Sequence, residues 1–443
     1  MNTEKMSPMM VQYLETKKEY PGCILFFRIG DFYEMFFDDA KTGAEELDLV
    51  LTGKDCGLPE RAPMCGIPYH AADNYITKLV KKGYSVAIGE QVEDPKTAKG
   101  LVKRSVIRVI TPGTICANEA LDEDKNNYLM SVAYADGLFG VSTVDVSTGD
   151  YYVTEIPDVR ALYDEINRFM PSELIVNDAF YNSEADIKLI KERWNVRVSE
   201  VNASYYDIEA DRRLIEEHFH ANAAGLGVGD MHAGIMAAGA VLKYVYDTQF
   251  SSVDYISEIK TYSTSEYMVI DTSTMRNLEL LESMRDKEKK GTLLWVLDKT
   301  RTAMGSRFMR RIISQPLLNK TAIEERQQAI AELNDRFIDR EEICEYLRPV
   351  YDLERLLAKF SSMRANPIDA NAFRQSLSML PHVKRLLESF ESELLKSIDA
   401  DLDPLSEICD ILERAIDEEA SVSVRDGGII RSGYDEEVDK LRA

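Results

Sequence analysis

The spacing of apolar residues changes along this 443-residue chain, and the change limits which fold it can adopt. As far as about residue 250, short apolar runs alternate with glycine- and proline-containing turns, often with period two, which is typical of strands interleaved with helices. Beyond residue 275, apolar residues recur every three or four positions almost without interruption, which is typical of amphipathic helices. The sequence therefore predicts a multidomain α/β plus α protein.

Residues 1–118 are predicted to form a mixed α/β domain, because strand-like and helical segments alternate there. The expected strands are 23–29, 32–37, 84–92 and 105–114, and the expected helices are 6–20, 38–51 and 71–82. Residues 59–70 are rich in proline and glycine and are therefore expected to form a loop. The acidic, polar segment 119–126 that follows suits a linker.

The rest of the chain is predicted to hold a second α/β domain and a helical segment. Three period-two segments after Tyr128 are separated by "YADG" and "VSTGD", which predicts an antiparallel meander within a domain at 127–250. Residues 251–443 are predicted to form long charged helices of a lever or a bundle. No cap or glycine stop follows the last helix before Ala443, so we expect the chain to be truncated within that element.

Charge is distributed unevenly along the chain. The formal net charge of −24 argues against a generally basic nucleic-acid binder. Residues 1–118, however, carry a net charge of only −1, and 81–110 within them hold seven basic and three acidic residues. The N-terminal domain is therefore the candidate for nucleic-acid binding, although a basic run of this kind is also typical of a solvated face.

No pattern in the sequence indicates an enzyme active site. The phosphate-loop motif G-x-x-x-x-G-K-[ST] does not occur, the five histidines are dispersed, and the six cysteines include no C-x-x-C pair. We therefore predict no catalytic residue, metal site or cofactor in this chain, and free thiols. The longest apolar run, 234–242, is too short to span a bilayer, and the N-terminus does not resemble a signal peptide, which predicts a cytoplasmic protein.

The stretch "RIGDFYEMFFDDA" at 28–40 places an aromatic and an acidic residue two positions apart on an expected strand. Phe32 and Glu34 then project from one face, and Tyr33 and Met35 from the other. One interpretation is a strand end with a solvated acid. The other is an apolar wedge with a hydrogen-bonding group, since proteins that kink DNA insert apolar side chains between base steps. The free-energy cost of this unstacking is smallest where base pairing is already defective.

Longer motifs resemble the MutS family of DNA mismatch-recognition proteins. They are "RIGDFYEMFFDDA", "PMCGIPYHAADNYITKLVKKGYSVAIGEQVEDP", "RVITPGT", "MGSRFMRRII", "LERLLAKF" and "VRDGGIIRSGYDEEVDKLR", and they follow one another from the N-terminus to residue 442. The resemblance implies a mismatch-binding domain at 1–118, an RNase-H-like connector at 127–250, and the first part of the helical core and lever at 251–443, truncated at the start of the clamp.

The resemblance also implies roles for residues of the N-terminal domain. The family's Phe-x-Glu signature is present as Phe32-Tyr33-Glu34, with Phe32 stacking against a mispaired or unpaired base and Glu34 hydrogen-bonding that base. Supporting DNA contacts are implied for Tyr33, Met64, Ile67 and Pro68, and for the basic residues Lys103, Arg104 and Arg108. The loop residues have a second interpretation, packing of the domain, and the basic residues could be ordinary exposed strand positions.

By the same resemblance, the partners are mismatched double-stranded DNA and, through the connector, a MutL-type protein. The family's ATPase, with its ATP and Mg²⁺, and its homodimer contacts belong to the full-length protein, so the chain as given is not expected to be an enzyme. Two alternatives stay open: a MutS homologue that binds another distorted DNA structure, and an interaction scaffold that does not bind DNA on its own.

Overall fold

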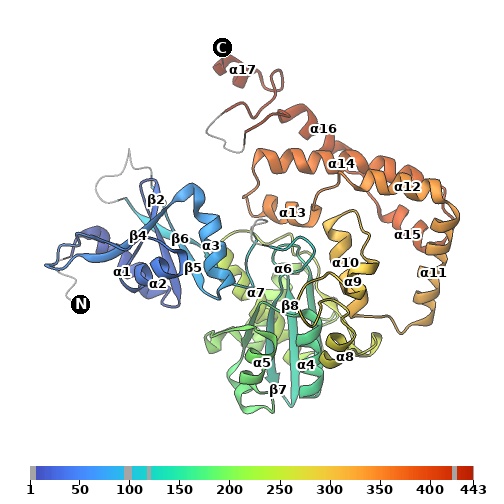
Figure 1. Ribbon diagram of the computed structural model, residues 1–443, viewed down its shortest axis with the longest axis horizontal. Coiled ribbons are helices and arrows are strands. Elements are labelled where there is room, and N and C mark those ends of the chain that lie inside the picture. Colours follow the sequence, from blue (N-terminus) through green and yellow to red (C-terminus); the bar gives the residue numbers. More distant parts are fainter. Residues whose placement is uncertain (1–5, 94–101, 117–120, 422–426, 443) are drawn as a thin grey trace. The chain divides into compact units, whose positions relative to one another are not determined.

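Two sheets and a run of helices build the chain in this computed structural model, which describes residues 6–93, 102–116, 121–421 and 427–442 (Figure 1). The described residues form two units, one with residues up to 122 and 127–261, the other with 123–126 and 262–443. Lys96 and Lys99 of the predicted basic run, and residues 119–120 of the predicted linker, lie outside the described residues. The architecture confirms the predicted α/β plus α class.

The first sheet has the strand order β3-β4-β2-β1-β5-β6. Its strands are β1 (Cys23–Ile29), β2 (Phe32–Phe36), β3 (Thr52–Lys54), β4 (Ala62–Pro68), β5 (Ser85–Gln91) and β6 (Arg104–Ile110), and its helices are α1 (Pro8–Glu19), α2 (Phe37–Leu47) and α3 (Ala72–Lys81). Strands β1 and β5 pair in parallel, whereas β1 and β2 form an antiparallel hairpin. Gly30 turns this hairpin with a φ of +59°, a conformation that side chains disfavour.

The two faces of this sheet bury different residues. On one face, Met10 and Tyr13 of α1 pack with Leu25, Phe27 and Phe36 of the central strands. This face carries every second residue of β2 and therefore also Phe32 and Glu34.

The opposite face is covered by the other two helices. Phe26, Tyr33 and Met35 pack there with Leu47 of α2 and Leu79 of α3. Tyr33 and Met35 thus point away from the face of Phe32 and Glu34, which confirms the alternation predicted from the sequence.

Strand β4 corrects the expectation that residues 59–70 form a loop. Residues Ala62–Pro68 pair with β2 on one side and with β3 on the other. The alternation of this segment is real, because Cys65 and Ile67 are buried while Met64 and Gly66 lie on the opposite face. Its prolines stand near the two ends of the strand, where fewer ladder hydrogen bonds are interrupted, so they did not prevent strand formation.

The second sheet has the order β11-β10-β7-β8-β9-β12. Its strands are β7 (Leu129–Ala135), β8 (Leu138–Val144), β9 (Tyr151–Ile156), β10 (Glu173–Val176), β11 (Arg197–Ser199) and β12 (Lys260–Thr261), and its helices are α4 (Val159–Phe169), α5 (Ile187–Trp194), α6 (Ile208–Phe219) and α7 (His232–Gln249). Strands β7, β8 and β9 form the predicted antiparallel meander. Helix α7 approaches β8 so closely that a Cβ at Gly140 would lie 1.9 Å from the carbonyl oxygen of Ala233.

A buried glutamate of β10, in the second sheet, hydrogen-bonds the segment that follows the last strand of the first sheet. Glu173 is fully buried and accepts hydrogen bonds from the backbone N–H of Gly113 at 2.9 Å and from the hydroxyls of Thr111, Ser199 and Tyr244 at 2.5, 2.5 and 2.8 Å. Thr111 and Gly113 belong to the "TPGT" segment directly after β6. The carboxylate therefore fixes how the chain leaves the first domain.

We expect Glu173→Gln to destabilise this unit by about 1 to 3 kcal/mol, because an amide NH₂ would face donors that now share two acceptor oxygens. Chemical denaturation of the chain would measure the change. Glu200→Gln is the matched control, since Glu200 is an exposed acid just beyond β11. Equal stability of the two variants would contradict the structural role of Glu173.

The other unit is helical. Its helices are α8 (Thr272–Asn277), α9 (Leu293–Leu297), α10 (Ala303–Ser314), α11 (Lys320–Asp335), α12 (Phe337–Leu347), α13 (Leu353–Ser361), α14 (Pro367–Leu387), α15 (Glu393–Asp401), α16 (Ser406–Ala415) and α17 (Glu436–Arg442). The nearly continuous apolar pattern of 292–317 is interrupted between α9 and α10, where the Thr302 side chain caps α10 by accepting the N–H of Gly305. None of the helices in the described part of the chain is long and apolar enough to cross a membrane.

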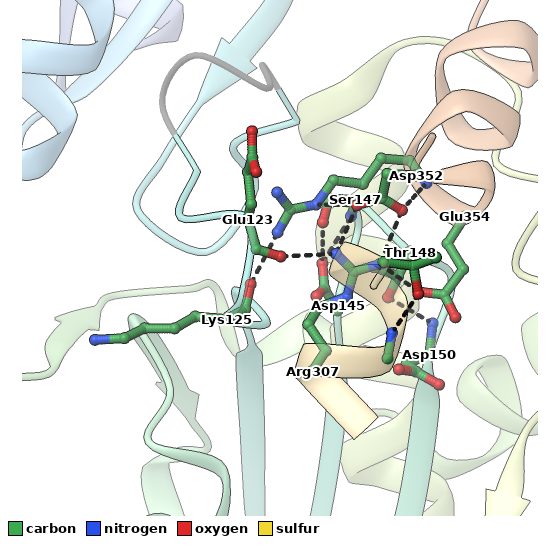
Figure 2. A network of polar contacts seen from close by, with 12 residues as sticks. Glu123, Lys125, Asp145, Ser147, Thr148, Asp150, Arg307, Asp352 and Glu354 are labelled. Atoms are coloured by element: carbon green, nitrogen blue, oxygen red, sulfur yellow. Dashed lines mark hydrogen bonds and ion pairs between the residues drawn. The ribbon is translucent and has the colours of Figure 1, made fainter. Parts of the chain in front are cut away.

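Buried arginines join residues 123–126 to this helical unit. Figure 2 shows Arg307 of α10 between the carboxylates of Asp352 and Glu354 and the carbonyl of Glu123. Arg355 of α13 donates to the carbonyl of Lys125 at 2.8 Å. Residues 123–126 thus contact α10 and α13 through their backbone carbonyls.

Candidate nucleic-acid interface

Phe32 is the exposed aromatic residue at the start of β2. Its side chain is 48% exposed, whereas Phe36 on the same face is buried under α1. Phe32 pairs with Ile29 of β1 and Pro68 of β4, so the backbone on both sides of it is held in the sheet. A large apolar side chain is therefore presented to solvent from a rigid position, which suits insertion into a partner.

Glu34 lies two residues further along the same face and is largely enclosed. Its side chain is 15% exposed and forms an ion pair with Lys54 of β3, with 2.5 Å between Nζ and Oε2. Gly66 of β4 lies opposite Glu34, and a Cβ there would lie 3.5 Å from Glu34 Cγ. The Glu34 carboxylate is therefore held at the sheet by its ion pair with Lys54.

The residues of β4 and β2 that the resemblance assigned to DNA support differ in accessibility. Met64 and Pro68 are half-buried and lie on the face of Phe32 and Glu34. Ile67 is fully buried and Tyr33 is nearly so, and the Tyr33 hydroxyl donates to Glu90. Burial raises the pKa of Tyr33 above its usual value. Ile67 and Tyr33 are thus packed inside the domain, which for Ile67 agrees with the second interpretation, while a role toward DNA stays a prediction for both.

The three basic residues near β6 also differ. The Lys103 side chain is exposed, and its backbone N–H donates to Glu93. Arg104 is engaged inside the domain: its Nε donates to the carbonyl of Arg28 at 2.6 Å and its Nη1 to Gln12 Oε1 at 3.1 Å. Burial lowers the pKa of Arg104. The Arg104 side chain therefore links β6 to β1 and α1. Arg108, on the same strand, is half-buried.

Lys54 is the one residue of this arrangement that sequence reasoning missed. It stands in "LTGKDC", a stretch with no motif of its own, and it contacts Glu34 only because β3 and β4 extend the sheet beyond β2. The one available signal was a lysine between two apolar segments, which is too common to be informative. Within the described residues, no group of three or more His, Cys, Asp or Glu side chains could hold a metal ion.

Three family models match this chain in order along its length. The model described as MutS domain I matches residues 7–119, MutS domain II matches 127–257, and MutS domain III matches 273–442. The chain belongs to the MutS family. Its first sheet, with Phe32 and Glu34, corresponds to MutS domain I, its second sheet to domain II, and its helical unit to domain III.

Curated relatives agree with this assignment. The chain is 53% identical over 439 residues to the DNA mismatch repair protein MutS of Lachnoclostridium phytofermentans, and 47% and 46% identical to the proteins of the same name from Ruminiclostridium cellulolyticum and Acetivibrio thermocellus. Each match includes 99% of this chain and 47 to 50% of the relative. The chain thus spans about half the length of the curated relatives it matches.

Proposed function

We propose that this chain recognises mispaired or unpaired bases in duplex DNA and thereby initiates mismatch repair. The observation that carries the proposal is the position of Phe32, an exposed phenyl ring held by two neighbouring strands within the part of the chain that matches MutS domain I. In this proposal Phe32 enters the minor groove and stacks against the defective base.

The selectivity follows from the energy of deforming DNA. Inserting an apolar side chain between base steps unstacks them at a cost of a few kcal/mol, and the cost is smallest where pairing is already defective. Phe32 would therefore sense deformability more than base identity, and the duplex would be kinked at the defect.

Glu34 would add a hydrogen bond to the displaced base. Its negative charge opposes binding beside phosphates, so a matched and stiff duplex, which offers no base edge in return, is held poorly. Both effects favour the defective duplex over the matched one.

Fluorescence anisotropy tests the proposal directly. A duplex with one G·T pair or one unpaired base is titrated with the chain, alongside its matched control, and we expect tighter binding to the defective duplex. Phe32→Ala should lose most of this preference, because it removes the stacking ring. Phe337→Ala is the control: Phe337 is 57% exposed but lies on α12, in the helical unit.

Three results would contradict the proposal. Equal affinity of the wild-type chain for both duplexes would show that Phe32 does not sense defects in this chain. Absence of binding by a folded chain would favour the alternative of an interaction scaffold. Retained preference in Phe32→Ala would place recognition on other residues.

The remaining functions are proposed from the family alone. We propose that ATP binding and hydrolysis with Mg²⁺ and homodimer formation depend on parts of the protein outside this chain, whose sequence contains no G-x-x-x-x-G-K-[ST] motif. We also propose that the domain at 127–257 provides the surface for a MutL-type partner, and that the protein is cytoplasmic.

A further inference from the structure

Lys54 occupies one side of the Glu34 carboxylate within the protein itself. From β3 its side chain passes the ring of Phe36, with Nζ 5.7 Å from the ring centroid, and reaches Glu34 Oε2 at 2.5 Å. The side chains of Lys54 and Glu34 are 30% and 15% exposed, so the pair is more shielded from water than an ordinary surface ion pair.

The two carboxylate oxygens are in different situations. Oε2 is held by Lys54, whereas Oε1 accepts no hydrogen bond from any residue that the structure describes. Gly66, which lies opposite Glu34 in the sheet, carries no side chain that could contact Oε1. One oxygen is thus fixed and the other can accept a hydrogen bond from a ligand.

A carboxylate that enters the minor groove approaches the phosphates of both strands, and this repulsion weakens binding to every duplex. An adjacent cation reduces this repulsion if it stays on the carboxylate. We infer that Lys54 is a positioning residue for base recognition: it offsets part of the Glu34 charge and fixes one oxygen so that Oε1 faces the defective base. This inference rests on the proposed function of Phe32 and Glu34.

A simpler role for Lys54 is direct contact with a DNA phosphate. The two roles predict different measurements. A lysine that binds phosphate acts independently of Glu34. Its loss makes the negative slope of log K against log salt concentration shallower by about 0.9. A lysine that acts through Glu34 shows strong coupling to it in a double-mutant cycle and leaves the salt slope nearly unchanged.

The experiment is a double-mutant cycle on the whole chain, with Lys54→Met, Glu34→Gln and the double variant, each titrated with defective and matched duplexes at several salt concentrations. We expect Lys54→Met to weaken binding of the defective duplex roughly tenfold when Glu34 is present, and only about twofold in the Glu34→Gln background, where no charge needs neutralising. Lys54→Arg should restore most of the loss.

Lys41→Met provides the control for removing one positive charge from the same domain. Lys41 lies on α2, and its ion-pair partner among the described residues is the exposed Asp38. It should weaken binding of both duplexes by less than about twofold. Thermal unfolding of each variant establishes that the domain remains folded, and Lys54→Arg keeps the test informative if Lys54→Met does not fold.

The outcomes separate this inference from the proposed function. Additive effects of Lys54→Met and Glu34→Gln, together with a lower salt slope, would overturn the role of Lys54 while leaving defect recognition intact. A wild-type chain without preference for the defective duplex would overturn the proposed function, and the role of Lys54 with it. Strong coupling with rescue by arginine would support both.

Discussion

Replacing Arg307 with methionine is expected to destabilise the helical unit by about 3 to 5 kcal/mol. The Arg307 side chain is 3% exposed and makes two hydrogen bonds to the Asp352 carboxylate, at 2.6 and 2.8 Å, and one to Glu354 at 2.6 Å. Burial lowers the pKa of Arg307, but the hydrogen bonds and charges of Asp352 and Glu354 outweigh burial and raise the pKa above its usual value, so the side chain stays charged. Methionine would fill the volume but leave the Asp352 carboxylate with a longer ion pair, 3.7 Å to Arg355 Nε, in place of its two short hydrogen bonds to Arg307.

The loss of Arg307 would also affect residues 123–126 and the N-terminal cap of α13. Its Nη1 also donates to the carbonyl of Glu123 at 3.0 Å, so the variant releases a contact that holds residues 123–126 to the helices. Asp352 caps α13 by accepting the N–H of Arg355. An Asp352 side chain that turns towards water after losing its hydrogen bonds to Arg307 would weaken that cap as well.

Thermal unfolding would measure the effect, with an expected fall of about 6 to 15 °C in the transition of the helical unit. Arg340→Met is the matched control, because Arg340 and its partner Glu341 are 33% and 47% exposed and such pairs contribute about 1 kcal/mol or less. If both variants melted at the same temperature, the network around Arg307 would be dispensable.

The sequence predicted best those features that depend on neighbouring residues. The neighbouring strands β1 and β2, with Phe32 and Glu34 on one face of β2, follow from local alternation and were found as predicted, and Gly30 lies in the turn between them. The meander of β7, β8 and β9 is another case. In both, strands adjacent in sequence are adjacent in the sheet, so no long-range information was needed.

The features that the sequence did not reveal depend on pairing between distant segments. Strand β4 was mistaken for a loop because its prolines and glycine outweighed a weak alternation. Because β4 lies between β3 and β2 in the sheet, a prediction without β4 could not place Lys54 of β3 beside Glu34 of β2. The candidate site was therefore recognised by its two motif residues, Phe32 and Glu34, but not by the cation that completes it.

The burial of individual charged side chains could also not be predicted from the sequence. Arg307, Glu173 and Asp211 stand in helical or strand-like segments whose charged residues normally face water, and nothing in their spacing separates them from exposed neighbours. Whether a charge is buried is decided by how the elements pack, and composition does not contain that information.

Asp211 should show the opposite response to substitution, a gain in stability. Its side chain is 2% exposed on α6, and its Oδ2 has no hydrogen-bond partner among the described residues. It packs directly against α7, where a Cβ at Gly239 would lie 2.2 Å from Asp211 Cβ. Burial, and then the charge of Asp207, raise the pKa of Asp211 to about 8.

The sign of the pH dependence follows from this raised pKa. Below about pH 4 the carboxyl is protonated in the folded and the unfolded chain, so it does not affect stability. Between about pH 4 and 8 the folded chain keeps a proton that the unfolded chain releases, so Asp211 destabilises the fold more as pH rises. Above about pH 8 the penalty is constant.

Asp211→Asn removes this penalty while preserving the shape of the side chain. We expect it to stabilise the unit by about 2 to 4 kcal/mol at pH 8 and by much less at pH 5. This range is smaller than the full linkage value of roughly 1.4 kcal/mol for each unit by which the pKa is raised. Melting temperatures at both pH values would measure the difference. Glu209→Gln, at an exposed acid on the same helix, should change neither.

A stabilisation by Asp211→Asn that was equal at pH 5 and pH 8 would contradict a titration of Asp211 in this window. A loss of stability at both values would mean that Asp211 accepts a hydrogen bond that the amide cannot replace. A gain confined to higher pH would show that α6 and α7 pack around a carboxyl group that remains protonated near neutral pH. In that case close packing of the two helices, including the approach at Gly239, compensates for the penalty of protonating Asp211.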